Sequence, residues 1–542
     1  MQVTQWLVTC ILAIAIVNPV QAGEVRWTKK FKKDIKYKKL TAAGIYLVLT
    51  DEGLFGLDPR TGVERWSVVD EKLKVDDIEY IEGSPLFLVT RTKGFTRKTS
   101  NMSAISIMDG QEIWRVEGIE GILVGNEPIP EHGLVLLFSM GGKDGIAINA
   151  FDIYAGSHKY KIAFPENQEM KRVSLKKSDS AGALSTRIKV TGHQQPVVDG
   201  DHLIMYYDYL RKIDLKTGRQ IWMDEEEDRA EPVNAPLLRS DYAQMFLQDG
   251  VIYTPYEKGM AAVDAASGEI KWRIEKLEGE RVTSIVSSGG AFIVRSGGFM
   301  KGSGKNATLV DPVYSVMSPS DGAMVWEKSY KLKGGGTNMQ VVGDKMYTIG
   351  AGKNLHIINM ADSKETAEKQ IKFKDAPHTI TYRKDGLLVQ SDQTVALYDI
   401  RGGDPKEMWT QYYKASGAFG YKSKMRMAAV NATAAMDASR RALRAYRVPS
   451  ANRTANNLRQ KTFNAFIAAI NARVTATRSS DRYQYVLTKL DDGVGLKGIN
   501  LKTGAADREV LFKDKNPQYD LDEMGGVLFY QKKKELTCFK LD

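Results

Sequence analysis

Short apolar runs alternate with turn-forming residues along most of the chain, and residues 196–223 show this pattern clearly. HLIMYY (202–207) and LRKIDL (210–215) are rich in apolar residues, and Gly218 precedes a third run, RQIWM (219–223). Runs of this length between turn residues predict antiparallel β-strands joined by tight turns. We expect the segment that follows each tryptophan to add a fourth strand to its unit.

The end of this unit recurs as an Asp or Ser, a Gly and an aromatic residue, spaced four residues apart. The copies are DPRTGVERW (58–66), SIMDGQEIW (106–114), DIYAGSHKY (152–160), DLKTGRQIW (214–222), DAASGEIKW (264–272) and SPSDGAMVW (318–326), with degenerate copies at 340–373 and 484–512. Repeats of a few short strands indicate a β-propeller, in which four-stranded sheets (blades) are arranged radially. We therefore predict an all-β fold of eight to ten blades.

Seven of the eight tryptophans lie beyond residue 22, and six of them close a copy of the repeat. The seven are Trp27, Trp66, Trp114, Trp222, Trp272, Trp326 and Trp409. We interpret them as blade-docking residues that lie between neighbouring blades, with the indole N–H bonded to a backbone carbonyl, and we assign Gly62, Gly218 and Gly268 to the turns. Trp27 has no copy of the repeat before it. We therefore expect residues 24–31 to complete the unit begun by 526–541, so that the two termini close the ring and leave no exposed sheet edge.

Residues 420–479 break the repeat and show a different period. Apolar positions at helical spacing occur on both sides of Pro449, which predicts two amphipathic helices in an αα-hairpin. The stripes are Met425, Ala428, Ala432, Met436, Leu443 and Tyr446, and then Leu458, Phe463, Phe466, Ile467, Ile470 and Val474. The propeller is thereby assigned to 23–419 and 480–542, with the hairpin as an insertion.

Charge concentrates in this insertion. From Lys422 to Arg478 there are twelve Lys or Arg residues and one acid, Asp437, so that 12 − 1 = +11, which equals the net charge of the whole chain. A basic amphipathic hairpin favours an anionic partner, either an envelope protein or an anionic surface. The candidate partner-binding residues are Arg440, Arg441, Arg444, Arg447, Arg453, Arg459 and Lys461. The alternative is that the helices pack on each other and the basic residues only face water. Nucleic acid is not expected.

The first 22 residues resemble a secretory signal peptide. WLVTCILAIAIV (6–17) is apolar but short, and Val20 and Ala22 occupy the small-residue positions of a cleavage site. We expect export to the periplasm or the extracellular space. Cys538 is the only cysteine beyond this segment, so no intrachain disulfide is expected. No later stretch is long and apolar enough to predict a transmembrane helix.

Other motifs point to no catalytic or metal site. SGGFMKGSGKN (296–306) lacks the first glycine and the following helix of a phosphate-binding loop, and is interpreted as a hairpin loop. DEEED (224–228) is interpreted as a solvated loop, and residues 165–185 as a long polar loop. The six histidines show no zinc-ligand spacing. We therefore predict no catalytic, cofactor-binding or metal-binding residues.

The repeated Asp-x-x-Thr-Gly-x-x-x-Trp phrase resembles the pyrroloquinoline-quinone-like (PQQ-like) propeller repeat. That family includes quinoprotein alcohol dehydrogenases, which bind the quinone with calcium on the propeller axis, and non-catalytic BamB-like members. The dehydrogenases usually carry two adjacent cysteines, which the single Cys538 beyond residue 22 cannot supply. BamB-like members carry a lipid-modified cysteine near their start. Cys10 lies inside the apolar run and follows Thr9 instead of a small Gly, Ala or Ser, so we do not expect it to be lipidated. The resemblance implies the fold and the compartment, and favours a scaffold over an enzyme.

The leading hypothesis is an exported, non-enzymatic, monomeric propeller that acts as a protein-interaction or assembly scaffold in the cell envelope. One alternative is a PQQ- and calcium-dependent oxidoreductase. Another is a cell-surface glycan-binding module. Each alternative predicts binding of its own ligand, and the scaffold predicts a macromolecular partner.

Overall fold

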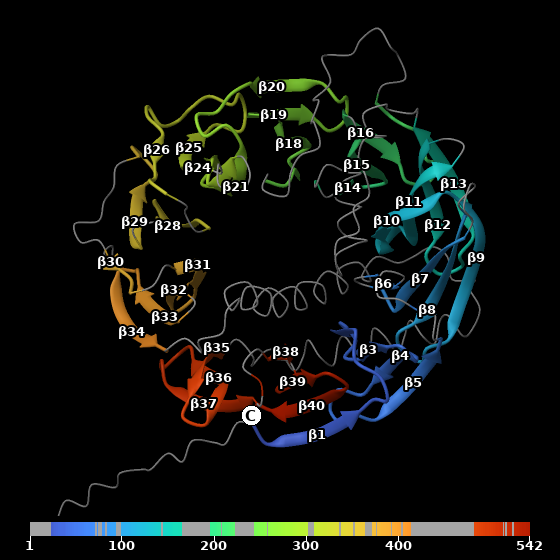
Figure 1. Ribbon diagram of the computed structural model, residues 1–542. Coiled ribbons are helices and arrows are strands. Elements are labelled where there is room, and N and C mark those ends of the chain that lie inside the picture. Colours follow the sequence, from blue (N-terminus) through green and yellow to red (C-terminus); the bar gives the residue numbers. More distant parts are fainter. Residues whose placement is uncertain are drawn as a thin grey trace, which may run out of the picture.

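The computed structural model describes residues 23–541, except for three long segments (165–193, 223–242 and 414–481) and several short gaps. Within these residues the chain forms ten antiparallel sheets arranged radially as a ring (Figure 1). The fold is therefore an all-β propeller, and ten blades is the upper end of the predicted range. The expected signal peptide and the expected helical hairpin both lie outside the described residues.

Successive sheets use successive strands. The first five contain β2 (Tyr37–Leu40), β3 (Tyr46–Thr50), β4 (Gly53–Leu57) and β5 (Glu64–Val69); β6 (Ile78–Tyr80), β7 (Leu86–Lys93), β8 (Thr99–Ser106) and β9 (Glu112–Glu120); β10 (Ile122–Ile129), β11 (Leu134–Gly142), β12 (Gly145–Asp152) and β13 (His158–Phe164); β14 (Val197–Asp199), β15 (His202–Tyr207) and β16 (Tyr209–Asp214); β17 (Phe246–Gln248), β18 (Val251–Tyr256), β19 (Gly259–Asp264) and β20 (Ile270–Ile274). A 3₁₀ turn, η2 (Pro130–His132), lies between β10 and β11.

The remaining sheets follow the same order. They contain β21 (Val282–Ser288), β22 (Ala291–Ser296), β25 (Val313–Met317) and β26 (Tyr330–Lys331); β27 (Gln340–Val342), β28 (Lys345–Ile349), β29 (Asn354–Asn359) and β30 (Ile371–Lys372); β31 (Pro377–Arg383), β32 (Gly386–Ser391), β33 (Thr394–Asp399) and β34 (Lys406–Tyr412); β35 (Tyr483–Leu490), β36 (Gly493–Asn500) and β37 (Ala506–Phe512); β38 (Gln518–Asp522), β39 (Val527–Lys532), β40 (Glu535–Lys540) and β1 (Val25–Lys30). A separate hairpin, β23 (Phe299–Lys301) and β24 (Thr308–Val310), is inserted between β22 and β25.

The two ends of the described chain share the tenth sheet. β1 pairs with β40 in antiparallel register, and Trp27 lies opposite Cys538. This pairing joins residues that are about 500 positions apart, as expected for residues 24–31 and 526–541. A cluster of buried side chains then connects this sheet to β2–β5.

The position of the fourth strand was predicted wrongly. The segment after Trp66 does not pair with β5; it forms β6, the innermost strand of the next sheet. The reason is that the Trp strand lies at the rim, so the chain must return to the centre to continue (Figure 1). The predicted strand 219–223 is not a full strand. Among its described residues, only Gln220 pairs with β16, through an isolated β-bridge to Ile213.

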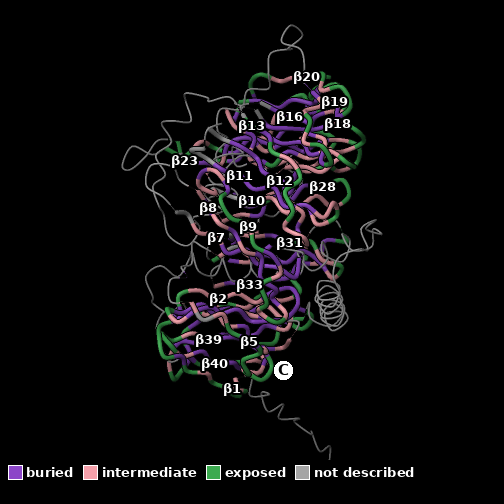
Figure 2. The backbone as a smooth tube through the Cα atoms, turned by 90° about the vertical axis from the view of Figure 1, so that its right-hand side faces the viewer, coloured by how far each residue is buried: buried purple, intermediate pink, exposed green. Residues whose placement is uncertain are grey.

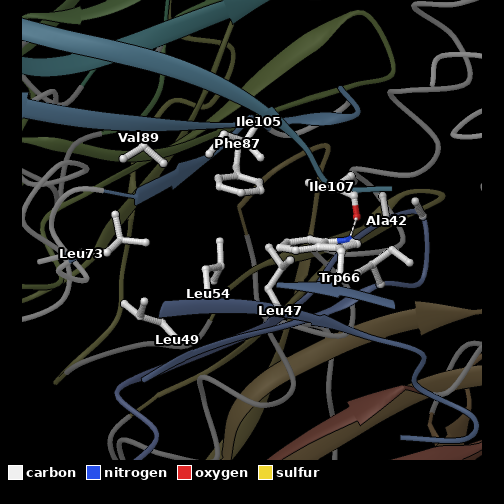
Figure 3. Close-up of a cluster of buried hydrophobic side chains, with 12 residues drawn as sticks. Ala42, Leu47, Leu49, Leu54, Trp66, Leu73, Phe87, Val89, Ile105 and Ile107 are labelled. Carbon is white, nitrogen blue, oxygen red and sulfur yellow. Dashed lines mark hydrogen bonds between the residues drawn. The ribbon is translucent and has the colours of Figure 1, made fainter. Parts of the chain in front are cut away.

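Buried side chains fill the interfaces between sheets. Ten hydrophobic clusters occupy the ten interfaces between neighbouring sheets. Figure 3 shows one of them, where Trp66, Leu47 and Phe87 lie between the first two sheets. The middle strands are covered on both sides, and every residue of β3 and β25 is buried. This explains their continuous apolar runs, because a strand with both faces covered need not alternate.

Strand order gives the ring two different faces. The Asp–Gly turns of the repeat lie on one face, which we call the phrase face. The turns between the second and third strands, and the segments that join successive sheets, lie on the other, which we call the connection face. In the edge-on view of Figure 2, β23 lies on the opposite side from the C-terminal end, which belongs to the phrase face.

Candidate interaction surface

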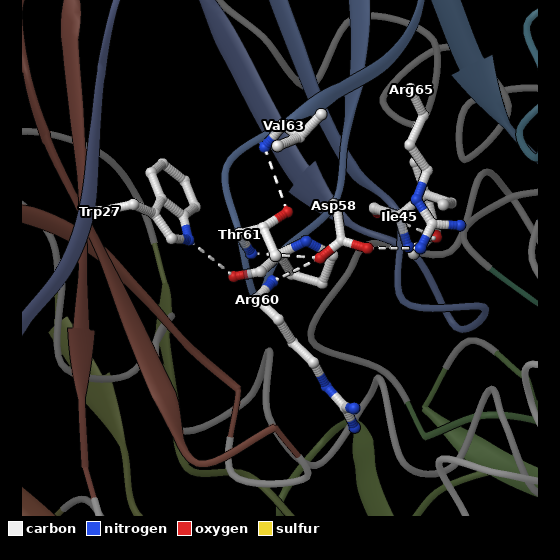
Figure 4. A network of polar contacts seen from close by, with 9 residues as sticks. Trp27, Ile45, Asp58, Arg60, Thr61, Val63 and Arg65 are labelled. Atoms are coloured by element: carbon white, nitrogen blue, oxygen red, sulfur yellow. Dashed lines mark hydrogen bonds and ion pairs between the residues drawn. The ribbon is translucent and has the colours of Figure 1, made fainter.

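The turns of the phrase face are held by their own aspartates. Asp58 Oδ1 accepts hydrogen bonds from the backbone N–H groups of Arg60 and Thr61, at 2.9 and 3.2 Å, and its other oxygen accepts one from the Arg65 guanidinium (Figure 4). Asp214 and Asp264 make the same backbone contacts. An aspartate at this position thus closes the turn, which explains why Asp begins the repeat.

These contacts keep the turn carboxylates ionised. Burial raises the pKa of Asp58, but the hydrogen bonds from Arg65 and the backbone outweigh it and lower the pKa. The backbone N–H of Ser267 lowers the pKa of Asp264 in the same way. A carboxylate whose charged form is favoured is a poor proton donor near neutral pH. We therefore interpret the repeated aspartates as structural.

Each docking tryptophan contacts the next sheet of the ring. The indole N–H donates to a backbone carbonyl of the following repeat. The pairs are Trp27 with Pro59 (3.1 Å), Trp66 with Ile107 (2.9 Å), Trp114 with Ile153 (2.9 Å), Trp222 with Ala266 (3.2 Å), Trp272 with Pro319 (2.8 Å) and Trp326 with Met360 (2.7 Å). In five of these pairs, all except Trp326 with Met360, the indole also covers the glycine of that repeat, so a Cβ at Gly62 would lie 2.5 Å from the Trp27 ring.

Two units depart from this arrangement. Tyr160 replaces the tryptophan before Gly218, whose Cβ would lie 2.3 Å from the Tyr160 ring. Trp409 covers Gly504, but its buried indole nitrogen has no hydrogen-bond partner among the described residues. The glycine positions Gly62, Gly218 and Gly268 all have positive φ, between 71° and 83°. Glycine is therefore required at these positions both for the backbone conformation of the turn and for the aromatic side chain that packs against it.

The candidate partner-binding residues of the sequence all lie outside the described residues. The seven basic residues from Arg440 to Lys461 therefore remain a prediction, and so do the loops at 165–185 and 224–228. The segment 296–306 contributes β23 to a two-stranded hairpin with β24. This is consistent with its interpretation as a hairpin rather than a phosphate-binding loop.

A calcium site would need carboxylate ligands among the described residues. Calcium takes six to eight oxygen ligands, mostly from carboxylates and carbonyls. No group of three or more His, Cys, Asp or Glu side chains in the described part of the chain could hold a metal ion. The buried Asp507 oxygen without a hydrogen bond lies on β37, an outer strand, away from the ring axis.

The connection face carries the irregular features of the ring. The β23–β24 hairpin projects there, held by Arg281 lying 4.2 Å over the Phe299 ring. The described segments that join one sheet to the next, such as 31–36 and 275–281, lie on this face too. On the opposite face, the turns of the repeat are closed by hydrogen bonds between their own residues. The connection face is therefore the candidate interaction surface.

Sequence reasoning missed a second basic region on this face. KKFKKDIKYKK (29–39) and KKK (532–534) come from the two ends of the chain and meet at the tenth sheet. The signal was present as two lysine runs. It was overlooked because the residues outside 422–478 sum to zero charge, and a sum over the whole ring hides a local cluster.

Comparison with protein families gives one match. Residues 98–313, less than half of the chain, match the family model described as "Outer membrane protein assembly factor BamB". The chain carries a PQQ-like propeller repeat. The resemblance inferred from the repeated phrase is confirmed at this level, and these PQQ-like repeats run from β8 to the start of β25.

Comparison with solved structures finds several similar chains. BamB from Moraxella catarrhalis is 17% identical, with 68% of this chain and 96% of that chain covered and a TM-score of 0.32. A quinohemoprotein alcohol dehydrogenase from Pseudomonas putida is 12% identical, with 69% and 71% covered and a TM-score of 0.32. A europium-containing methanol dehydrogenase is 12% identical, with 69% and 84% covered and a TM-score of 0.32. At these values the likenesses do not distinguish a scaffold from an enzyme.

Comparison with curated proteins found no match. In the part of the chain that the structure describes, no helix combines the length and the apolar character that crossing a membrane requires.

Proposed function

We propose that this chain is an exported, non-enzymatic propeller that acts as a protein-interaction or assembly scaffold in the cell envelope. The observation that carries the proposal is the difference between the two faces of the ring. On the phrase face the turns of the repeat are closed by their own aspartates, whereas the β23–β24 hairpin and the described segments that join successive sheets lie on the connection face. Loops presented on a rigid scaffold are where binding residues concentrate.

Two further observations support the scaffold. The match of residues 98–313 is to a family described as an assembly factor, and the expected signal peptide would deliver the chain to the envelope. The turn carboxylates close their own turns, and among the described residues no group of three or more His, Cys, Asp or Glu side chains could hold a metal ion. The proposal therefore includes no cofactor.

Site-specific photo-crosslinking in the native host tests which face is used. A photo-reactive amino acid replaces Lys258, Lys333 or Lys374 on the connection face, all of which are exposed. We expect these positions to yield the same crosslinked protein, because they share one surface. The matched positions on the phrase face are the exposed Lys216, Lys384 and Lys502. Crosslinks confined to those three would contradict the proposal.

A second measurement separates the scaffold from the oxidoreductase. Titration of the purified chain with pyrroloquinoline quinone and calcium should give no saturable binding. Stoichiometric binding would instead support the enzyme. A version that lacks 420–479 should then be compared in the crosslinking experiment, to determine whether the expected hairpin contributes to the interface.

A further inference from the structure

Six lysines from opposite ends of the chain form one exposed cluster on the connection face. They are Lys32, Lys33, Lys36, Lys532, Lys533 and Lys534, and we call them the terminal lysine patch. The Lys32 side chain is 87% exposed. Both segments belong to the junction between the tenth sheet and the first, near the bottom of the ring in Figure 1.

Backbone contacts hold the two lysine runs side by side. The N–H of Phe31 donates to the carbonyl of Lys534 at 2.8 Å, and the N–H of Ile35 donates to that of Lys533 at 3.1 Å. The Gln531 side chain donates to the carbonyl of Ile35 at 3.0 Å. Phe31 and Ile35 are both buried in the core between the two sheets. The patch is therefore fixed by the fold, and its side chains need no rearrangement of the backbone to meet a partner.

The charge of the patch is only partly neutralised. Lys32, Lys36 and Lys532 form ion pairs with Glu52, Asp51 and Asp514. Within the described part of the chain, no ion pair within 4.0 Å involves Lys33, Lys533 or Lys534, which are all exposed. Ion pairs at an exposed surface contribute little to stability. The lysines can therefore exchange these partners for other anions at little cost.

The composition of the patch indicates the kind of partner. It contains no arginine, and no exposed large hydrophobic side chain lies within 31–36 or 531–535. Protein interfaces favour arginine and aromatic residues and disfavour lysine. Lysine acts as a compact point charge without fixed geometry. These properties fit a surface of diffuse negative charge, to which basic clusters bind within about one Debye length.

We propose that the terminal lysine patch binds an anionic phospholipid surface. It would hold the ring with its connection face toward the bilayer. The proposal goes beyond the scaffold role and does not rest on it. It also places a lipid-binding site on the propeller itself, separate from the predicted basic hairpin.

Vesicle co-sedimentation of the purified full chain tests the proposal. Vesicles of phosphatidylcholine containing about one-third phosphatidylglycerol should bind the chain at about 0.1 M salt, and vesicles of phosphatidylcholine alone should not. Each lysine near such a surface contributes roughly fivefold to binding. The triple variant K33Q/K533Q/K534Q should therefore bind about a hundredfold more weakly. Circular dichroism should show that this variant keeps the parent fold.

The matched control is K216Q/K384Q/K502Q, which removes the same charge from the phrase face. Its binding should fall by less than about threefold, because those lysines face away from the bilayer. If both variants lose the same amount of vesicle binding, the binding depends only on the net charge of the chain, and the proposal is overturned. Unchanged binding by the patch variant would overturn it too, and would assign binding to another segment. Binding of poly-L-glutamate without binding of vesicles would indicate an acidic protein partner instead.

Discussion

At the scale of single residues, one contact is used repeatedly. A tryptophan of one sheet donates its indole N–H to the next sheet and covers the glycine there. The hydrogen bond fixes the position of the indole. Because glycine has no Cβ, the indole can pack directly against the backbone of the turn. The contact therefore joins neighbouring sheets at the rim of the propeller.

The first prediction compares two tryptophans. Trp326 donates to Met360 at 2.7 Å, whereas the buried nitrogen of Trp409 has no partner among the described residues. W326F should therefore lose about 1–2 kcal/mol more stability than W409F, because only the first leaves a carbonyl without its donor. Urea unfolding followed by circular dichroism measures both. Equal losses would mean that the hydrogen bond contributes nothing.

The second prediction compares two glycines of nearly equal backbone conformation. Gly218 and Gly250 have φ of 75° and 74°, but only at Gly218 does an added Cβ collide, with the Tyr160 ring at 2.3 Å. G218A and G250A should share a backbone cost of about 1 kcal/mol. G218A should lose roughly a further 1–3 kcal/mol from overpacking. Thermal melts of the two variants check this, and a G250A as damaging as G218A would contradict it.

At the scale of elements, side-chain contacts supplement the cores between sheets. Asn338, just before β27, bonds both the N–H and the carbonyl of Ile380 in β31, at 2.9 and 2.7 Å. The amide thus extends backbone-like pairing from one sheet to the next near the ring axis. The same interface buries Tyr347 of β28 and Tyr398 of β33. It therefore combines polar and apolar contacts, and the hydroxyl groups of its two buried tyrosines can titrate.

The third prediction concerns the pH dependence of this interface. Burial raises the pKa of Tyr347 and of Tyr398 to about 12, against about 10 in an unfolded chain. Because the pKa values are higher in the folded state, folding is favoured while the tyrosines stay protonated. This contribution to the free energy of unfolding is fully present below a pH of about 10 and is lost as the pH rises toward 12. Urea midpoints should fall over this range. The fall should be shallower in Y347F and unchanged in Y412F, since Tyr412 is 47% exposed.

At the scale of the whole molecule, the ring depends on a junction between the two ends of the chain. β1 lies at the rim of a sheet whose other strands are β38–β40. Trp27 then donates to Pro59 of the first sheet, and Cys538 is fully buried behind it. Stability of this junction therefore requires residues from both ends.

The fourth prediction uses Cys538 as a reporter of the junction. Burial raises the pKa of its thiol to about 12, so both access and thiolate are lacking near neutral pH. Reaction with a thiol reagent should be negligible in the native chain. W27A should accelerate it by about tenfold or more, because the large-to-small change opens the core beside the thiol.

The control for this experiment is W222A, which damages a different interface. Its thiol should react at the parent rate under native conditions. If W222A accelerates labelling as much as W27A, the ring opens as a whole and the junction has no local stability of its own. Cys10 belongs to the expected signal peptide and must be absent from the labelled protein.

The sequence by itself determined the repeat, the residues of the turns and the residues that dock one sheet on the next. The turn features are local: Asp58 bonds its own turn, and Gly62 takes the positive φ that the turn requires. Such properties depend on neighbours a few residues away, so a single sequence expresses them.

Only the tertiary structure decided which residues meet across long distances. It set the number of sheets at ten, placed the strand that follows Trp66 in the next sheet, and left Trp409 without a hydrogen-bond partner among the described residues. It also brought Lys33 and Lys533 together from opposite ends of the chain. These outcomes depend on how successive sheets pack around the ring. That packing is a property of the whole fold, and no local pattern of residues encodes it.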